Sequence, residues 1–250
     1  MNSSYSILAN FYDSTIGVDY GEWADYLLSL MSNFHHVPQD ILDLGCGTGN
    51  LSLFFARKGY NLLGIDLSPQ MIELALAKIK DEDMPIDFLV QDIRDLNLSG
   101  KQFDTVISTC DVLNYILTYN ELSAVFEGVH KVLKPGGLWL FDLNSTKKLK
   151  QIYGNESYAD LQTDFAYFWD NSYDRENKVV SMELTFFVQT TEGLYERVVE
   201  EHRQKLWFPD DVDQIAENSG FSLRGSYDFL TTGPCNPRGE RWQFVLEKRK

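Results

Sequence analysis

The glycine-rich segment at residues 41–50 constrains the fold more than any other part of the chain. It reads I-L-D-L-G-C-G-T-G-N, so an apolar lead-in runs directly into a loop at 45–49. An amphipathic helix then begins with Leu51, Phe54 and Phe55. Glycines permit tight backbone angles and the close approach of a ligand to the main chain. The helix N-terminus adds free N–H groups and the positive end of the helix dipole. This pattern predicts a strand, a ligand-binding loop and a helix.

The surrounding sequence extends this unit into a larger fold. From about residue 20 to 145, short apolar runs alternate with amphipathic helices, which predicts βαβ units and a parallel sheet. Ser68-Pro69 is typical of a helix start, Asn120 is a candidate cap for a second helix, and a third helix is predicted over about 210–219. The strand candidates are 41–45, 61–66, 86–91, 103–109 and 137–143.

Residues 151–207 have a different pattern. Val180, Met182, Leu184, Phe186 and Val188 alternate with mostly polar residues, and such a period of two indicates an antiparallel strand with one wetted face. We therefore expect an antiparallel insert in the parallel domain. A chain of 250 residues is long enough for one large domain with such an insert.

Acidic residues mark the ends of the first three strands. Asp43 lies just before the glycine loop, Asp66 ends the second strand 21 residues after Gly45, and Asp92 follows the third. Polar groups at successive strand ends indicate one ligand lying across the carboxyl edge of the sheet, and an acidic residue at the second strand can accept ribose hydroxyls. Asn50 stands where the dinucleotide pattern G-x-G-x-x-G needs its third glycine.

Charge and cysteine content restrict the partners and the compartment. The formal net charge is −15 and no basic patch is visible, which argues against a nucleic-acid partner. The three cysteines form no C-x-x-C pair, which favours a reducing compartment and argues against a zinc site or any other metal site. The first basic residue is Arg57, and no apolar run approaches the ~20 residues of a membrane span. These features predict a cytoplasmic protein that does not act at a membrane.

Five motifs together resemble those of class I S-adenosylmethionine-dependent methyltransferases. They occur in that family's order and spacing over about residues 38–145. They are 41–50, Gly64-Ile65-Asp66-Leu67-Ser68, Gln91-Asp92-Ile93, Phe103-Asp104-Thr105-Val106 and Leu133-Lys134-Pro135-Gly136-Gly137. The resemblance implies a doubly wound, mostly parallel seven-stranded α/β sheet of the Rossmann-like methyltransferase type. It also implies S-adenosylmethionine as cofactor and in-line methyl transfer as the reaction.

The resemblance also implies a set of cofactor contacts. The backbone of Gly45, Cys46 and Gly47 would run alongside the methionine part of the cofactor. Asp43 would hold the ammonium group of that part, directly or through water. Asp66 would hold the ribose hydroxyls. The remaining expected contacts are Leu67 and Met71 against the adenine, Asp92 on its exocyclic amine, Ile93 packing beside it, and Cys110 near the sulfonium.

The expected acceptor side is assembled from three segments. Residues 1–37 resemble a helical lid in which Tyr12, Tyr20 and Trp23 would form an aromatic wall for the sulfonium cation. Asp111, Asn114 and Tyr115 follow the fourth strand, where the family places acceptor contacts. The insert over 151–207 would cover the acceptor site of a cofactor domain formed by 38–150 and 208–250. Tyr12 and His202 are the candidate catalytic residues.

A small-molecule acceptor, methylated at nitrogen or oxygen, fits these features best. No Asp/Asn-Pro-Pro-aromatic run follows the fourth strand, and Pro234-Cys235 lies too near the C-terminus to serve as the nucleophile of a base methylase. Among small-molecule members, amine and amino-sugar N-methyltransferases are the most similar. The alternatives are a non-catalytic S-adenosylmethionine-binding protein, an RNA methyltransferase, and a nicotinamide-dependent oxidoreductase. Either a monomer or a homodimer is compatible with the sequence.

Overall fold

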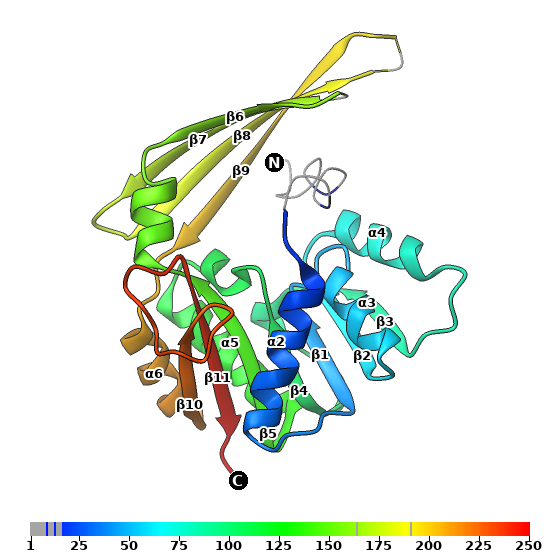
Figure 1. The fold of residues 1–250 in the computed structure, drawn as a ribbon, viewed down its shortest axis with the longest axis vertical. Helices are drawn as coiled ribbons and strands as arrows, with labels where there is room; N and C mark the ends of the chain where they lie inside the picture. Colours follow the sequence, from blue (N-terminus) through cyan, green and yellow to red (C-terminus); the bar gives the residue numbers. More distant parts are fainter. Residues whose placement is uncertain (1–8, 10–12, 14–16, 164, 191) are drawn as a thin grey trace.

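The chain forms two β-sheets, which a computed structural model describes for residues 9, 13, 17–163, 165–190 and 192–250 (Figure 1). The larger sheet has seven strands in the order β10-β11-β5-β4-β1-β2-β3. Its strands are β1 (Asp40–Leu44), β2 (Asn61–Asp66), β3 (Ile86–Val90), β4 (Phe103–Ser108), β5 (Leu133–Asn144), β10 (Phe221–Asp228) and β11 (Arg241–Lys248).

Strand directions confirm the predicted doubly wound sheet. Neighbouring strands pair in parallel across the sheet from β5 through β4, β1 and β2 to β3. In contrast, β11 runs antiparallel to both β5 and β10. Because β1 lies between β2 and β4, the strand order reverses there, and open α/β sheets bind their ligands outside the carboxyl ends of the strands at such a point. Strand β5 begins at Leu133, four residues earlier than the candidate strand at 137–143. Its pairing with β4 is irregular over the Pro-Gly-Gly segment.

The helices begin and end close to the expected positions, with one correction. α4 (Pro69–Ile79) has Ser68 as its N-cap, and α6 (Pro209–Asn218) matches the third predicted helix. α5 (Tyr119–Val132) is capped by Thr118, whose hydroxyl accepts a hydrogen bond from the backbone N–H of Glu121, so Asn120 already lies inside the helix. The expected cap was wrong because Thr118 and Asn120 are both good capping residues, and sequence alone does not choose between them.

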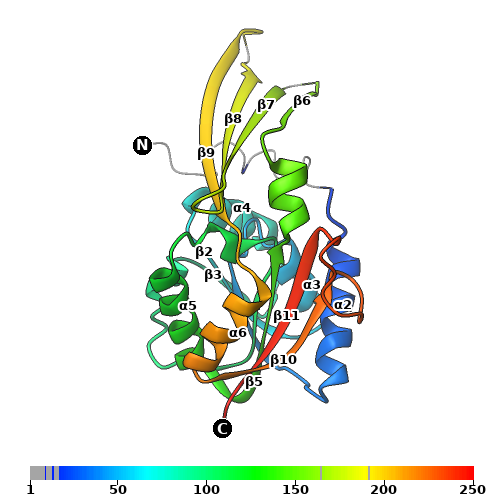
Figure 2. The same cartoon turned by 90° about the vertical axis from the view of Figure 1, so that its left-hand side faces the viewer.

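Helices cover both faces of the seven-stranded sheet (Figures 1 and 2). On one face, α2 (Tyr20–Asn33), α3 (Asn50–Arg57) and α4 share a core cluster that includes Leu27, Phe55 and Ile72. On the other face, α5 and α6 bury side chains that include Phe126 and Ile215. Both faces therefore exclude water, and the carboxyl edge is left for a site.

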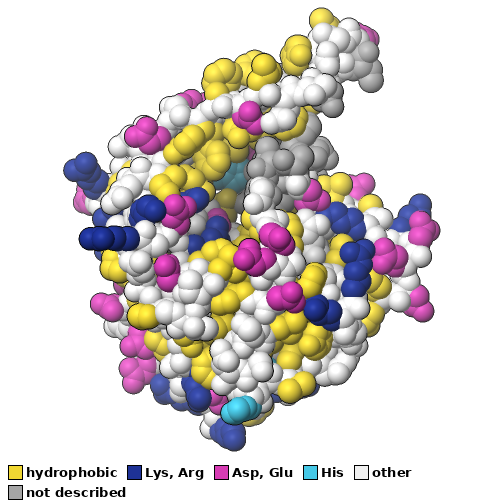
Figure 3. Space-filling view, viewed as in Figure 1, with side chains coloured by type: hydrophobic (Ala, Val, Ile, Leu, Met, Phe, Trp, Pro, Cys, Tyr) yellow, Lys and Arg dark blue, Asp and Glu magenta, His cyan; other side chains and the backbone are white. Residues whose placement is uncertain are grey.

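The smaller sheet is the predicted antiparallel insert, and we call it the arm. Its strand order is β6-β7-β8-β9, formed by β6 (Ser157–Leu161), β7 (Phe165–Asp174), β8 (Val179–Gln189) and β9 (Tyr195–Lys205). As predicted, Val180, Met182, Leu184 and Phe186 are buried on one face of β8. With Leu149, in the short helical segment η3 (Lys148–Tyr153), they form a hydrophobic cluster separate from the main core. The arm projects beyond the carboxyl edge of the main sheet, and apolar side chains gather along it in Figure 3.

Candidate active site

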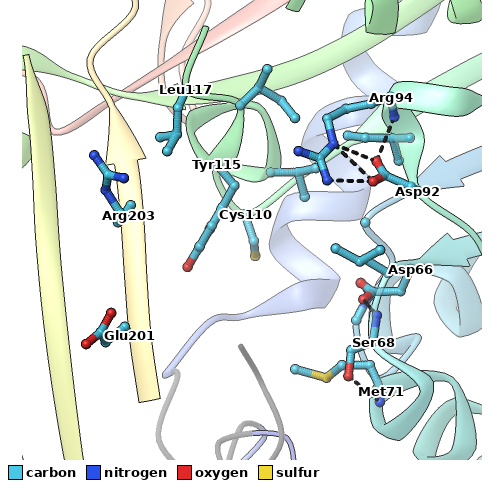
Figure 4. Close-up of a pocket in the computed structure, with 16 residues that line it drawn as sticks. Asp66, Ser68, Met71, Asp92, Arg94, Cys110, Tyr115, Leu117, Glu201 and Arg203 are labelled. Carbon is cyan, nitrogen blue, oxygen red and sulfur yellow. Dashed lines mark hydrogen bonds and ion pairs between the residues drawn. The ribbon is translucent and has the colours of Figure 1, made fainter. Parts of the chain in front are cut away.

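A cavity of about 460 Å³ opens at the carboxyl edge of the main sheet, next to the arm (Figure 4). One wall comes from the segments that follow β1, β2 and β3, and β9 of the arm forms the opposite wall. Between them lies η2 (Val112–Tyr115), a short turn of 3₁₀ helix after β4. The lining residues on the sheet side are Gly45, Gly47, Asp66, Leu67, Ser68, Met71, Asp92, Ile93 and Arg94, and those on the η2 and arm side are Cys110, Val112, Tyr115, Ile116, Leu117, Glu201 and Arg203.

The glycine loop allows main-chain atoms to line the cavity. Gly45 has φ 74°, and a Cβ there would lie 2.3 Å from Cγ2 of Val112, so only glycine fits against η2. Gly47 has φ 55° and faces open space. Both conformations are in the left-handed region that L side chains rarely adopt. The loop therefore presents bare backbone toward a ligand.

Asp66 is held at the end of β2 by main-chain donors. The backbone N–H of Gly47 donates to its Oδ2 at 2.9 Å, and that of Ser68 donates to its Oδ1 at 2.8 Å. Burial raises the pKa of Asp66, and these N–H groups oppose that change. The backbone N–H of Leu67 also contributes, and a carboxylate, which accepts about four hydrogen bonds, keeps acceptor capacity for ligand hydroxyls.

Asp43 lies just behind the glycine loop and does not line the cavity. Its side chain is buried and accepts a hydrogen bond from the Ser52 hydroxyl, while its other oxygen is also buried and has no hydrogen-bond partner among the described residues. Burial, with the nearby Asp66 charge, raises the pKa of Asp43 to about 7. An unsatisfied buried carboxylate oxygen costs stability, so this position is suited to a cationic or hydrogen-donating ligand group.

Asp92 lines the cavity in an ion pair that the sequence did not indicate. The guanidinium of Arg94 donates to Asp92 at 2.6 and 3.0 Å and also to Glu121 at 3.0 Å. These contacts lower the pKa of Asp92 and fix its carboxylate (Figure 4). Arg94 itself also lines the cavity. A residue two positions after an acidic residue gives no sequence signal for such a pair.

The residues after β4 take an uncommon backbone conformation. Cys110 and Asp111 have φ 61° and 56°, and the backbone N–H of Asp111 donates to Asp142 at 2.9 Å. This turn places the Cys110 thiol on the cavity wall between Asp66 and Tyr115 (Figure 4). Cys46, by contrast, does not line the cavity, and burial raises the pKa of its thiol.

Three residues expected on the acceptor side make their contacts away from the cavity, and two of them, Asp111 and Asn114, hold the arm to the main sheet. Trp23 is 2% exposed and packs edge-on against Phe229, with the Arg241 guanidinium over its ring. Asp111 accepts hydrogen bonds from Arg241 at 2.7 Å and from Gln204 of β9 at 2.6 Å.

The third residue, Asn114, is fully buried. It donates to the carbonyl of Lys205 at 2.8 Å and accepts from the backbone N–H of Asn144 at 2.9 Å. None of Trp23, Asp111 and Asn114 lines the cavity: Asp111 and Asn114 bond to the root of the arm, whereas the indole N–H of Trp23 is buried without a hydrogen-bond partner among the described residues. The structure does not bring these three residues to the cavity, and their acceptor roles stay predictions, whereas Tyr115 does line the cavity.

The predicted lid is described only in part, and Tyr12 lies outside the described residues. Tyr20 begins α2 beside Asn50 and does not line the cavity. Burial, with neighbouring Cys110, raises its pKa. Asp13 accepts hydrogen bonds from Thr48 at 2.7 Å, Asn50 at 2.8 Å and Lys78 at 2.7 Å. Asn50, the residue that breaks the dinucleotide pattern, thus helps to anchor the N-terminal segment.

The arm contributes residues from both faces of β9. Glu201 and Arg203 line the cavity, whereas Glu200 and His202 are buried on the other face of β9, which they share with Leu184 and Met182 of the neighbouring β8. The Tyr115 hydroxyl lies 3.5 Å from Nδ1 of His202. The candidate base is therefore next to the cavity wall without lining it.

Comparison with known proteins identifies the family. A methyltransferase domain family matches residues 41–137. The crystal structure of an S-adenosylmethionine-dependent methyltransferase from Clostridium acetobutylicum ATCC 824 superposes with a TM-score of 0.88 at 30% identity, covering 97% of this chain and 98% of that one. Over 248 residues, the chain is 34% identical to the methyltransferase YqeM of Bacillus subtilis strain 168, and 98% of each protein is covered. The chain belongs to the class I S-adenosylmethionine-dependent methyltransferases.

This methyltransferase shares its whole architecture, arm included, with more distant proteins. An amino pentose methyltransferase from Micromonospora echinaspora, solved with S-adenosylmethionine bound, superposes over 99% of each chain with a TM-score of 0.74. At 20% identity this likeness concerns the fold alone. The family assignment confirms S-adenosylmethionine as the cofactor and excludes the nicotinamide-dependent oxidoreductase. No helix among the described residues is long and apolar enough to cross a membrane.

The cavity of this methyltransferase fits its cofactor. The exposed backbone at Gly47, the free acceptor positions of Asp66 and the unsatisfied Asp43 oxygen all lie at the sheet edge. Met71, 2% exposed, and Ile93, 8% exposed, add an apolar surface suited to a planar base. The donor set thus suits a nucleoside joined to a charged amino-acid group.

Proposed function

We propose that this methyltransferase acts on a small-molecule acceptor, at a nitrogen or an oxygen atom, by in-line methyl transfer. The cavity supports the proposal because it has two unlike walls, one of main-chain groups and carboxylates and one of arm side chains. When bound, S-adenosylmethionine supplies an activated methyl group on a positively charged sulfur. The protein's main task is to hold donor and acceptor in line, with the reacting atoms about 3–3.5 Å apart.

On the sheet side we assign the nucleoside contacts. Asp66 accepts the ribose hydroxyls at the positions that Gly47 and Ser68 leave open. Leu67 and Met71 lie against the adenine, with Ile93 packing beside it. Asp92 is assigned to the exocyclic amine, which would share the two carboxylate oxygens with Arg94. The Asp92–Arg94 ion pair supports this assignment, since it holds the carboxylate in one orientation.

Toward the methionine end, the assignment rests on Asp43 and the glycine loop. Asp43 attracts the ammonium group, directly or through water, and the backbone of Gly45, Cys46 and Gly47 passes alongside. Cys110 lies near the sulfonium region. Tyr12 and Tyr20 remain expected contacts from the lid, although Tyr20 does not line the cavity.

The arm sets acceptor choice in this proposal. Tyr115, Glu201 and Arg203 face the space beyond the expected sulfonium position, and residues 151–207 cover it as an insert in the cofactor domain. The lid predicted over 1–37 would cover the other side, and of its described residues Asp13 bonds to Thr48, Asn50 and Lys78. A cavity of this volume is in the usual range of about 300–1,000 Å³ for small-molecule sites.

Acceptors that carry an amine are the first class to test. The net charge of −15 attracts cations and repels phosphate backbones, which favours an amine over RNA. The similar fold of an amino pentose methyltransferase adds support for amino sugars within this class. Phenols and alcohols are the oxygen acceptors to be tested beside the amines.

The test is methyl transfer from labelled S-adenosylmethionine to amines, amino sugars, phenols and a structured RNA, each followed by mass spectrometry of the product. We expect at least one small molecule to be methylated, and the RNA to remain unmodified. Methylation of RNA alone would contradict the proposal. Tight cofactor binding with no transfer to any compound of the set would favour a non-catalytic S-adenosylmethionine-binding protein.

A further inference from the structure

A chain of three polar side chains leads from the cavity wall into the arm. Tyr115 of η2 lines the cavity, and its hydroxyl lies 3.5 Å from Nδ1 of His202 on β9. On the far side of the imidazole, Nε2 lies 3.3 Å from Oε2 of Glu200. The Tyr115 and His202 rings meet edge to face, with centroids 6.0 Å apart.

The two inner members of this chain lie in an apolar environment. In the β8–β9 register, His202 is opposite Met182 and Glu200 is opposite Leu184, both of which belong to the arm's hydrophobic cluster. His202 is 3% exposed and Glu200 is 2% exposed. A buried carboxylate is costly unless it is paired, and apolar residues at both positions would pack this face without that cost. A polar pair here therefore points to a function rather than to the stability of the arm.

Hydrogen-bond partners assign the imidazole tautomer. The carboxylate of Glu200 accepts, so Nε2–H donates to it, and Nδ1 keeps a lone pair toward the cavity side. The Tyr115 hydroxyl then donates to Nδ1. A separation of 3.5 Å is long for such a bond, and catalytic hydrogen bonds commonly tighten only when the substrate is bound.

We propose that Tyr115 is a catalytic residue that removes a proton from the methyl acceptor, and that His202 and Glu200 are positioning residues that receive and stabilise this proton. The inference rests on the proposed function and narrows its acceptor class. The reacting atom carries a proton that must leave, as in an alcohol, a phenol or a protonated amine. A neutral amine that needs no base would not require this chain of side chains.

The proposed step balances without a further reactant. The acceptor oxygen or nitrogen forms its bond to the methyl carbon, and the carbon–sulfur bond breaks with its electron pair left on sulfur. The acceptor's proton passes to Oη of Tyr115 while the phenolic proton of Tyr115 passes to Nδ1 of His202. The resulting imidazolium is paired with the Glu200 carboxylate and later loses its proton to water.

Kinetics of Tyr115→Phe on the best acceptor found in the methylation assay test this step. General acid–base groups contribute about 10²–10⁴-fold, so we expect kcat to fall about 100-fold or more while the acceptor KM stays within about threefold. Glu200→Gln should lower kcat by about tenfold with KM again unchanged, because Gln keeps an acceptor for Nε2–H but not the charge. The matched control is Tyr167→Phe, a tyrosine on the same arm that packs against Phe186 and does not line the cavity.

Nitrogen-15 NMR of the complex with S-adenosylhomocysteine, the demethylated product, gives a readout that needs no acceptor. His202→Gln assigns the His202 signals. In Tyr115→Phe we expect the Nδ1 signal to move toward that of an unbonded ring nitrogen, while Nε2 stays protonated.

Three outcomes overturn the inference, and they are distinguishable. If a compound is methylated and Tyr115→Phe keeps kcat within about threefold of wild type, or loses activity through KM alone, Tyr115 is not the base. If neither ring nitrogen signal moves, the Tyr115–His202 contact does not exist in the complex. If the signal moves but no compound is ever methylated, the proposed function itself fails, and the catalytic role fails with it.

Discussion

The two walls of the cavity are built in different ways. The sheet-side wall combines bare backbone at Gly45 and Gly47 with side chains at the ends of β2 and β3, and its central carboxylate, Asp66, is fixed by backbone N–H donors. The arm-side wall consists of side chains on an edge strand with its own hydrophobic cluster. A glycine backbone and a carboxylate held by backbone donors do not depend on the side chains of the arm, so a cofactor site can persist while the arm varies. We therefore expect substitutions on the two sides to have separable effects.

A substitution at the joint between the arm and the main sheet should give the largest effect, a loss of stability. Arg241 of β11 is paired with the buried Asp142 and with Asp111 at 2.7 Å, and Asp111 contacts Gln204 of the arm. In Arg241→Met, two carboxylates lose their counterion. Breaking a buried pair costs about 3–5 kcal/mol, and we expect a loss of that size in the free energy of unfolding measured by urea denaturation at pH 8.

Arg224→Met is the matched control for this joint. Arg224 also meets a carboxylate at 2.7 Å, that of Glu247, but the Arg224 side chain is 46% exposed. An exposed pair is worth about 0–1 kcal/mol, so this variant should be close to wild type. Equal losses in the two variants would show that the Arg241 cluster does not hold the arm.

Cofactor binding on the sheet side should depend on pH through the titration of Asp43. Its pKa of about 7 means that the carboxyl is mostly protonated at pH 5.5. A bound ammonium group favours the carboxylate and lowers that pKa. Cofactor binding should therefore release most of one proton per protein at pH 5.5 and a smaller fraction of a proton at pH 7.5. The affinity for S-adenosylmethionine should accordingly rise with pH over this interval, by at most about tenfold per unit.

Calorimetric titration in two buffers of different ionisation enthalpy measures this proton release. Asp43→Asn should abolish it, because the amide does not titrate. Proton release that persists unchanged in Asp43→Asn would mean that another group is responsible, and the assignment of Asp43 to the ammonium would be wrong.

The anchor of the N-terminal segment should give a smaller effect. Burial alone would raise the pKa of Asp13, but hydrogen bonds from Lys78, Thr48 and Asn50 lower it overall, so the carboxylate is ionised near neutral pH. Asp13→Asn removes the charge that pairs with Lys78. Because these groups are partly exposed, we expect S-adenosylhomocysteine to bind only about three- to tenfold more weakly in a fluorescence titration.

Lys80→Met serves as the control for this anchor, since Lys80 is an exposed lysine just after α4. It should leave the affinity unchanged. An unchanged affinity in Asp13→Asn as well would show that the contacts of Asp13 do not contribute to cofactor binding.

Sequence predicted the sheet-side wall better than the arm-side wall, and the reason is physical. Around Asp43, Gly45 and Asp66, local spacing determines structure, because a strand, a tight glycine loop and a helix must follow one another within a few residues. The alternation in Val180, Met182 and Leu184 likewise predicted an antiparallel strand. The seven-stranded sheet and the cofactor were implied by the resemblance of these motifs to the methyltransferase family, whereas strand β10 was not among the strand candidates.

The arm-side wall depends on contacts between residues far apart in the chain. Asp111 and Asn114 were expected to meet the acceptor, but their partners are Arg241, Gln204 and Asn144, and no local pattern indicates those pairings. The same holds for the contact of Tyr115 with His202, 87 residues apart. Glu201 and Arg203 could be read as one face of a charged strand, but only the tertiary structure places that strand at the cavity.

Calorimetric titration of S-adenosylhomocysteine into the wild type, Asp66→Ala and Arg203→Ala tests the division of the cavity most directly. Losing two hydrogen bonds to a charged group, each worth about 1.5–3 kcal/mol, should weaken binding to Asp66→Ala by about 100-fold or more. Arg203→Ala, on the opposite wall, should bind within about threefold of wild type. Retained affinity in Asp66→Ala, or a comparable loss in both variants, would contradict a cofactor site built on the sheet and an acceptor site built on the arm.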